Sequence, residues 1–120
     1  MLHSVFSDRE GTLLWGVREK PNEPMTGVLF AHTYWSAKHG GRAIWLEQLY
    51  VRPTARRLGL GRLLVNALLD WAEVNGIRGI DLESYRLNAP ASILYRSMGF
   101  RRLGRERFTL TIVEETKDEN

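Results

Sequence analysis

Hydrophobic residues near the start of the chain fall in two segments, 12–20 and 25–36, which are rich in branched and aromatic side chains. Such side chains favour strands. The stretch between them, Pro21 to Pro24, is typical of a turn. A third apolar segment, 43–51, follows a break at residues 38–41 and suits a strand covered on both faces. The first half of the chain therefore predicts an antiparallel three-stranded meander.

The spacing of apolar residues changes after the third segment. Leucines recur at Leu60, Leu64 and Leu68, which is the period of a helix with one buried face. Gly76, preceded by an asparagine, predicts the end of this helix because glycine readily adopts the left-handed conformation. The pattern therefore predicts one long helix directly after the meander.

The remaining pattern predicts a strand at 77–85, a short helix at 89–99 and a final strand or hairpin at 100–113. The order is then three strands, a helix, a strand, a helix and a strand. A strand–helix–strand unit after a meander implies an α/β protein with a mixed sheet and helices packed against it. At 120 residues, we expect residues 1–120 to form a single domain.

Composition narrows the class of protein. Hydrophobic residues make up 43% and charged residues 26%, as in an ordinary globular chain. The absence of cysteine excludes disulfides, thiolate metal sites and thiol catalysis, and favours a reducing compartment. No stretch approaches the about 20 apolar residues of a membrane span. We therefore expect a cytoplasmic protein that does not bind membranes.

Positive charge is concentrated in the middle and later parts of the chain. The formal net charge is +3, and twelve arginines lie between Arg42 and Arg107. Such a region is expected to meet anions. Nucleic acid and a phosphate-rich small ligand both remain open on charge alone, but no stacking aromatics accompany a basic run, so we rank specific nucleic-acid binding last.

The loop between the third predicted strand and the long helix contains closely spaced arginines and glycines. It comprises Arg56, Arg57, Leu58, Gly59, Leu60 and Gly61, with Arg62 directly after it. Glycines let backbone amide groups face one point, and a helix that begins there adds the positive end of its dipole. A diphosphate would meet several N–H donors. A tight strand-to-helix turn with solvated arginines would have a similar sequence, so the loop alone leaves both interpretations open.

A second string of residues follows the loop at a characteristic distance. It runs Asn88-x-x-Ala91-x-x-x-Tyr95-x-x-x-Gly99-Phe100. In the order and separation of the two strings, the chain resembles the GNAT superfamily of N-acetyltransferases. The resemblance extends over roughly residues 12–108.

This resemblance implies a GNAT-like acyl-CoA N-acyltransferase fold with acetyl-CoA as co-substrate and no metal. In the family, the glycine-containing loop binds the coenzyme A pyrophosphate, a role that would fall on residues 56–62. Asn88 and Tyr95 would lie beside the pantetheine and the sulfur. The backbone of Leu49, Tyr50 and Val51 would run along the pantetheine arm as another strand does. We therefore expect an acetyl-CoA-dependent N-acetyltransferase.

Two departures from the family pattern concern the loop and the N-terminus. Arg57 stands where the family usually has glycine. Only about eleven residues precede the meander, where the family usually has a strand and one or two helices that wall the acceptor site. The fold is therefore expected to lack much of this region. An acetyl-CoA-binding domain without turnover remains an alternative, and so does an N-acetyltransferase acting on proteins or peptides.

Within the superfamily, the likeness extends to the diamine and polyamine N-acetyltransferases. It rests on the strand WLEQLYVRP, at residues 45–53, and on the aromatic strand GVLFAHTYW before it. It implies a small-molecule primary amine as acceptor. Tyr34 and Trp35 could line an acceptor slot, although tryptophans and tyrosines are more often core residues. An exposed edge of the meander also predicts a homodimer.

The chemistry requires a base and an acid. An alkyl amine with a pKa of about 10.4 is less than about 0.1% neutral at pH 7, so a group must accept its proton. Resemblance gives this role to Glu47, directly or through water, and the period of two puts its side chain on the face of Leu49 and Val51. A tyrosine is protonated at pH 7, and Tyr95 is the expected general acid for the leaving thiolate. Helical spacing places Tyr95 beside Ala91 and Gly99.

Overall fold

The computed structural model describes residues 3–9, 11–56, 58–84 and 88–113, and for residues 3–9 it describes the backbone only. The chain divides into two compact units, Met1–Asn88 and Ala89–Asn120. The expectation of a single domain stays a prediction.

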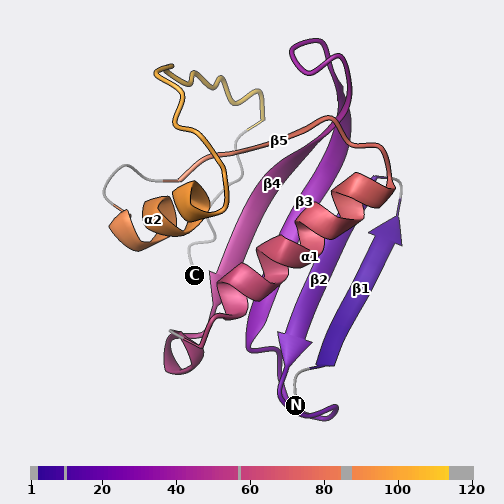
Figure 1. Ribbon diagram of the computed structural model, residues 1–120, viewed down its shortest axis with the longest axis vertical. Helices are drawn as coiled ribbons and strands as arrows, with labels where there is room; N and C mark the ends of the chain where they lie inside the picture. The colour runs from indigo at the N-terminus through magenta and orange to yellow at the C-terminus, as the bar shows by residue number, and fades with distance from the viewer. Residues whose placement is uncertain (1–2, 10, 57, 85–87, 114–120) are drawn as a thin grey trace. The chain divides into compact units, whose positions relative to one another are not determined.

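The first unit is built on a mixed five-stranded sheet with the strands in chain order (Figure 1). The strands are β1 (His3–Arg9), β2 (Thr12–Arg18), β3 (Gly27–Ser36), β4 (Gly41–Val51) and β5 (Gly79–Leu82). Neighbours run antiparallel, except that β4 and β5 are parallel. The parallel pair needs a crossover connection, and the long helix supplies it. The predicted α/β class with a mixed sheet is confirmed.

The meander has one more strand than the sequence pattern predicts. β1 occupies His3–Arg9 and pairs along its whole length with β2, joined to it by a turn in which Gly11 has a φ of +82°. Polar and charged residues interrupt the apolar pattern of β1, which is why alternation did not reveal it. No helix lies between β1 and β2 in the described residues. The described residues ahead of β2 thus contain a strand and no helix, which is consistent with the expected shortened N-terminal region.

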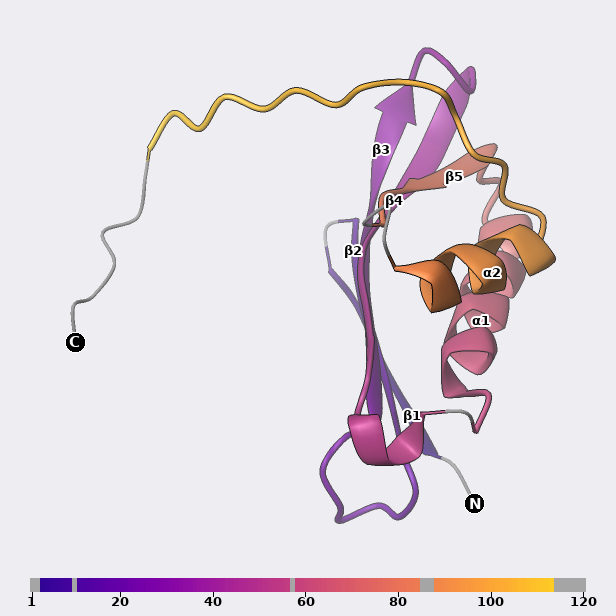
Figure 2. The same ribbon diagram turned by 90° about the vertical axis from the view of Figure 1, so that its left-hand side faces the viewer.

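The helix α1 (Leu60–Val74) covers one face of the sheet (Figure 2). It packs on β2, β3 and β4 through the apolar stripe that the leucine spacing predicts. Its buried residues are Leu60, Leu64, Val65, Leu68 and Ala72. Gly27 of β3 permits close approach, because a Cβ there would lie 3.3 Å from Leu64 Cδ1. As predicted, α1 ends at Asn75 and Gly76, where Gly76 has a φ of +70°.

The core of the first unit lies between α1 and the sheet. Leu13, Leu29 and Ile44 are fully buried, and Trp15 meets Trp71 of α1 edge to face at 6.5 Å between ring centroids. We call the other side of the sheet the uncovered face, since no described helix of the first unit lies on it (Figure 2). It carries the side chains that alternate with this core: Leu14, Phe30, His32, Tyr34 and Trp45.

The second unit contains α2 (Ala89–Ser97). Gly99, with a φ of +98°, ends the helix, and the Phe100 N–H donates to the Tyr95 carbonyl at 3.0 Å. The Tyr95 and Phe100 rings meet edge to face at 5.7 Å. A hydrogen bond and an apolar contact of this kind define a common helix end, so this part of the second string has a local structural role. Gly99 lies beyond α2 and does not share a helical face with Tyr95, contrary to the prediction.

The predicted final strand or hairpin at 100–113 is wrong. No strand forms among the described residues after α2. Apolar residues alternate there, but Phe108, Leu110 and Ile112 are 82–85% exposed. Alternation gives a segment strand propensity, whereas a strand also needs a partner for its backbone.

Candidate active site

The arginine- and glycine-containing loop connects the end of β4 to the start of α1. After β4, Pro53–Ala55 form one short 3-10 turn whose Ala55 is buried. Gly59 then takes a left-handed conformation, with a φ of +79°, and α1 begins at Leu60. Leu60 is 4% exposed and anchors the helix end in the core, whereas Leu58 is 65% exposed. The loop therefore holds the N-terminus of α1 at the carboxyl end of β4.

The N-terminus of α1 suits an anion. No side chain caps it, and no acidic residue lies in its first turn. The first intrahelical bond runs from the Leu63 N–H to the Gly59 carbonyl at 3.0 Å, so the N–H groups of Leu60, Gly61 and Arg62 precede the bonded part of the helix. A Cβ at Gly59 would meet nothing within 4 Å, so the side of Gly59 on which a Cβ would lie is open. These features fit the phosphate-binding role that the sequence predicts.

Arg56 turns back onto β4. Its Nε–H donates to the Val51 carbonyl at 3.0 Å, and its guanidinium carbon lies 6.0 Å from the centre of the Tyr50 ring. A guanidinium has four further N–H donors besides Nε. Arg56 therefore places a positive charge beside the end of β4. Arg57 lies outside the described residues.

β4 and β5 pair over only part of their length. The parallel pairing runs from Ala43 to Leu46 on β4 and ends with Leu82 on β5. Within the described residues, the backbone of β4 from Glu47 to Val51 has no strand partner on the β5 side. This free edge includes Leu49 and Tyr50 and leads to the loop. A ligand could pair with it as an added strand does.

The free edge begins at an irregularity in β4. On β3, Phe30 pairs with Gln48 but the next residue, Ala31, pairs with Leu46, so Glu47 is an extra residue. The Glu47 Oε1 atom lies 3.8 Å from His32 Nε2, and the two side chains are 48% and 42% exposed. Glu47 thus reaches toward the uncovered face.

The prediction that Glu47 shares a face with Leu49 and Val51 is wrong. Leu49 and Val51 pair with Leu29 and Gly27, whose positions face α1. Glu47 instead meets His32. The cause is the extra residue, because a bulge interrupts the period of two along a strand.

Asn88 and Tyr95 belong to different units. Asn88 is exposed at the end of the first unit, and Tyr95 is half-buried on α2. Burial raises the pKa of the Tyr95 phenol above its ordinary value, so this residue stays protonated at neutral pH. The proximity of Tyr95 to Glu47 and to the loop stays a prediction.

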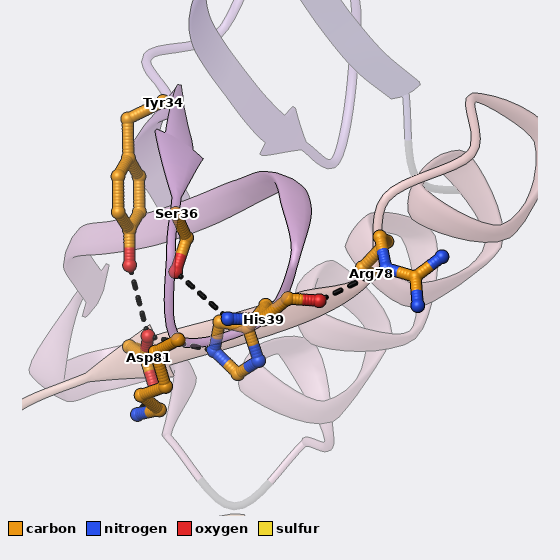
Figure 3. Close-up of polar contacts among 6 residues, drawn as sticks. Tyr34, Ser36, His39, Arg78 and Asp81 are labelled. Carbon is orange, nitrogen blue, oxygen red and sulfur yellow. Dashed lines mark hydrogen bonds and ion pairs between the residues drawn. The ribbon is translucent and has the colours of Figure 1, made fainter.

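Sequence reasoning missed a cluster around Asp81 of β5 (Figure 3). Asp81 accepts hydrogen bonds from the Tyr34 hydroxyl and from Lys38 Nζ, each at 2.9 Å, and lies 3.0 Å from His39 Nε2. Partial burial raises the pKa of Asp81, but the hydrogen bonds from Lys38, His39 and Tyr34 outweigh it and hold the pKa below the ordinary value. Arg78 Nε donates to the His39 carbonyl at 2.9 Å. The cluster fastens the β3–β4 turn to β5.

The cluster changes the expectation for the acceptor slot. Tyr34 lies on the uncovered face with its hydroxyl committed to Asp81. Its neighbour Trp35 is 75% exposed and points to the other side of β3, because successive strand residues alternate. The two side chains therefore do not line one slot.

The described residues contain no group of three or more His, Cys, Asp or Glu residues that could hold a metal ion. None of the helices described is long and apolar enough to cross a membrane.

Comparison of the sequence with known proteins gives a family match over most of the chain. Residues 2–100 match the model of the acetyltransferase (GNAT) family. The [ribosomal protein bS18]-alanine N-acetyltransferase of Salmonella typhimurium is 42% identical over 55 residues, which cover 46% of this chain and 37% of that protein. Streptothricin acetyltransferase of Streptomyces lavendulae is 40% identical over 55 residues, covering 46% and 29%. The chain spans about a third of the length of the curated relatives that it matches.

A solved structure with low sequence identity has a similar fold. The ribosomal-protein-alanine N-acetyltransferase of Brucella melitensis superposes with a TM-score of 0.75 at 14% identity. The match covers 92% of this chain and 100% of that one. Likeness at this identity concerns the fold.

Proposed function

This chain belongs to the GNAT family of acetyltransferases, and on that basis we propose that it transfers the acetyl group of acetyl-CoA to a primary amine. The observation that carries the proposal is the N-terminus of α1. It has no side-chain cap, follows the left-handed Gly59 and stands at the end of a strand whose edge is free from Glu47 to Val51.

The donor acetyl-CoA would extend from the loop along β4. Its pyrophosphate would accept hydrogen bonds from the N–H groups at the start of α1, with Arg56 and Arg62 supplying positive charge. Its pantetheine arm would pair with the free edge at Leu49, Tyr50 and Val51. A strand amide there would stabilise the oxyanion of the thioester. Asn88 is proposed to lie beside the pantetheine.

The acetyl group would then be transferred by direct attack. Glu47, at the start of the free edge, is the proposed general base, directly or through water, and Tyr95 is the proposed general acid for the thiolate. The protonated state of Tyr95, which its raised pKa favours, is the state that an acid needs. The bond from nitrogen to the acetyl carbon forms as the bond from that carbon to sulfur breaks.

A small-molecule amine, of the diamine, polyamine or amino-acid kind, is the proposed acceptor. The aromatic residues of the uncovered face and the carboxylate of Glu47 offer apolar and anionic contacts to an alkylammonium ion. A protein acceptor is the second candidate, since one relative is named for acting on the alanine of a ribosomal protein. Another relative is named for streptothricin.

Release of the coenzyme A thiol measures the reaction directly. We would incubate the protein with acetyl-CoA and, separately, a diamine, a polyamine, alanine, an aminoglycoside, streptothricin and a peptide that begins with alanine. Thiol release above background with a small amine supports the proposal, and release with the peptide alone favours the second candidate. Binding of coenzyme A in a calorimeter without release for any acceptor would favour an acetyl-CoA-binding domain.

We also propose that the protein is a cytoplasmic homodimer. The absence of cysteine suits a reducing compartment. β1 pairs only with β2 among the described strands, and an unpaired strand edge invites association. A mass equal to one chain in light scattering at high protein concentration would contradict the dimer.

A further inference from the structure

His32 lies beside the proposed base on the uncovered face. It is a β3 residue directly opposite Trp45, and its Nε2 atom is 3.8 Å from Glu47 Oε1. Both side chains are less than half exposed, so each is held by the sheet and still reached by solvent. The pair stands where the free edge of β4 begins. An acceptor approaching Glu47 from the uncovered face therefore also meets His32.

The contact with Glu47 forms at the bulge in β4. Glu47 follows Leu46, which pairs with Ala31 on the α1 side, so strand alternation directs Glu47 to the face that carries Trp45 and His32. A carboxylate therefore faces an imidazole across two neighbouring strands. Carboxylate–imidazole pairs are a common arrangement for proton transfer, because the carboxylate stabilises the imidazolium that forms.

An imidazole matches the required proton transfer better than a carboxylate does. Carboxyl side chains titrate near about pH 4, whereas imidazoles titrate between about pH 5 and 8. The efficiency of a base is greatest when its pKa lies near the working pH.

We infer that Glu47 acts through His32, so that the imidazole, in place of the carboxylate itself, removes the proton from the acceptor amine and Glu47 is its partner. The inference rests on the proposed acetyl transfer. The neutral imidazole takes one proton from the acceptor ammonium, and the free amine then attacks the thioester carbon. The new carbon–nitrogen bond forms, the carbon–sulfur bond breaks, and the thiolate receives a proton from the general acid. The acetylated nitrogen then loses its second proton, which restores the general acid. The imidazolium beside Glu47 returns its proton to water.

Among the side chains that the structure describes, Glu47 is the carboxylate that contacts His32. On β3, the Tyr34 ring centre is 6.5 Å away, and its hydroxyl is bonded to Asp81 of β5. Lys38 and His39 also bind Asp81 and neutralise it. On β2, the residue opposite His32 is Thr12, which does not titrate. These contacts favour a pair that works through Glu47.

His39 provides a matched control. Its Nε2 atom is engaged by Asp81, its backbone is bonded to Ser36 and Arg78, and its ring packs against Gly79 (Figure 3). It is a histidine of the same part of the sheet whose role is to fasten a turn. Replacing His39 removes one imidazole, as replacing His32 does, but leaves the His32–Glu47 pair in place.

The experiment compares the pH dependence of kcat/KM for wild type, His32→Gln and His39→Gln, measured by thiol release. We expect His32→Gln to lose about 100-fold or more in kcat/KM at pH 7 and to lose the rise in rate across the imidazole range. Coenzyme A affinity by calorimetry should stay within about twofold, since the N–H donors at the start of α1 are untouched. His39→Gln should keep the wild-type pH profile.

A second variant guards against a structural explanation. We expect His32→Ala to be rescued by free imidazole in proportion to its concentration, and His39→Ala to show no such rescue. An active wild type with an unchanged pH profile in His32→Gln would overturn the role of His32 while leaving the proposed function standing. A wild type without thiol release for any acceptor would overturn both. Loss of coenzyme A binding in His32→Gln would also contradict this role.

Discussion

Gly59 and Gly76 are equivalent residues in conformational terms, because each flanks α1 with a left-handed backbone and open space at Cβ. An alanine at such a φ costs about 1–2 kcal/mol. We predict that Gly59→Ala and Gly76→Ala lower the free energy of unfolding by similar amounts. Only Gly59→Ala should also raise the KM for acetyl-CoA, because it lies before the N–H groups that would hold the pyrophosphate. Denaturant unfolding and steady-state kinetics measure the two effects.

The comparison isolates ligand binding from stability. Equal increases in KM in both variants would mean that the loop acts only through the stability of α1. An unchanged KM in Gly59→Ala would contradict the placement of the pyrophosphate.

Asp81 predicts a pH dependence of stability. Its pKa is lower in the folded protein than in the unfolded chain, where it is about 3.9. Its contribution is therefore fully present above the unfolded pKa and is lost as the pH falls through the folded pKa. We predict that Asp81→Asn unfolds at a lower denaturant concentration than wild type at about pH 6, and that the difference shrinks below about pH 4. Asp70→Asn, on the exposed side of α1, serves as the control. A difference that is the same at both pH values would contradict the role of ionised Asp81.

The sequence predicts the conformation of some residues but not the contacts of others. The turn at Gly59 and the end of α1 at Gly76 follow from local rules about φ and helix ends, and both were predicted. The Asp81 cluster joins residues more than 40 positions apart, as its bond to Lys38 shows. No local pattern encodes such a contact, because it depends on which strands become neighbours.

At the scale of elements, the free edge of β4 predicts a pattern of hydrogen exchange. Amides of β4 that point toward β5 are bonded up to Leu46, and those from Glu47 to Val51 lack a strand partner on that side. We predict faster exchange in the second segment and protection there when coenzyme A binds. The amides of β2, which is paired on both sides, are the internal control. Protection confined to the loop would show that the pantetheine does not pair with β4.

Elements were predictable where one local rule determines them. The period of the leucines predicted α1, and apolar runs predicted β2, β3 and β4. The bulge at Glu47 is a shift by a single residue that no periodicity reveals, yet it puts Glu47 and Leu49 on opposite faces of the sheet. The alternation at 100–113 predicted a strand that does not form in the part of the chain that the structure describes. A sequence pattern shows strand propensity, but it does not show whether a partner strand is available.

At the scale of the whole molecule, the distribution of charge predicts how the affinity for acetyl-CoA depends on salt. The net charge is +3. Two exposed arginines, Arg56 in the loop and Arg62 in the first turn of α1, belong to the proposed pyrophosphate site. Charges exposed to solvent are screened within about 8 Å at physiological salt and about 3 Å at 1 M. We therefore predict that the affinity for acetyl-CoA, measured by calorimetry, falls as salt rises over this range. It should fall less in Arg62→Gln, since one screened attraction is already absent. Arg42→Gln, at the other end of β4, removes the same charge away from the loop and should retain the wild-type salt dependence. An affinity that does not change with salt would mean that burial of the ligand, and not the arginines and the helix end, dominates binding.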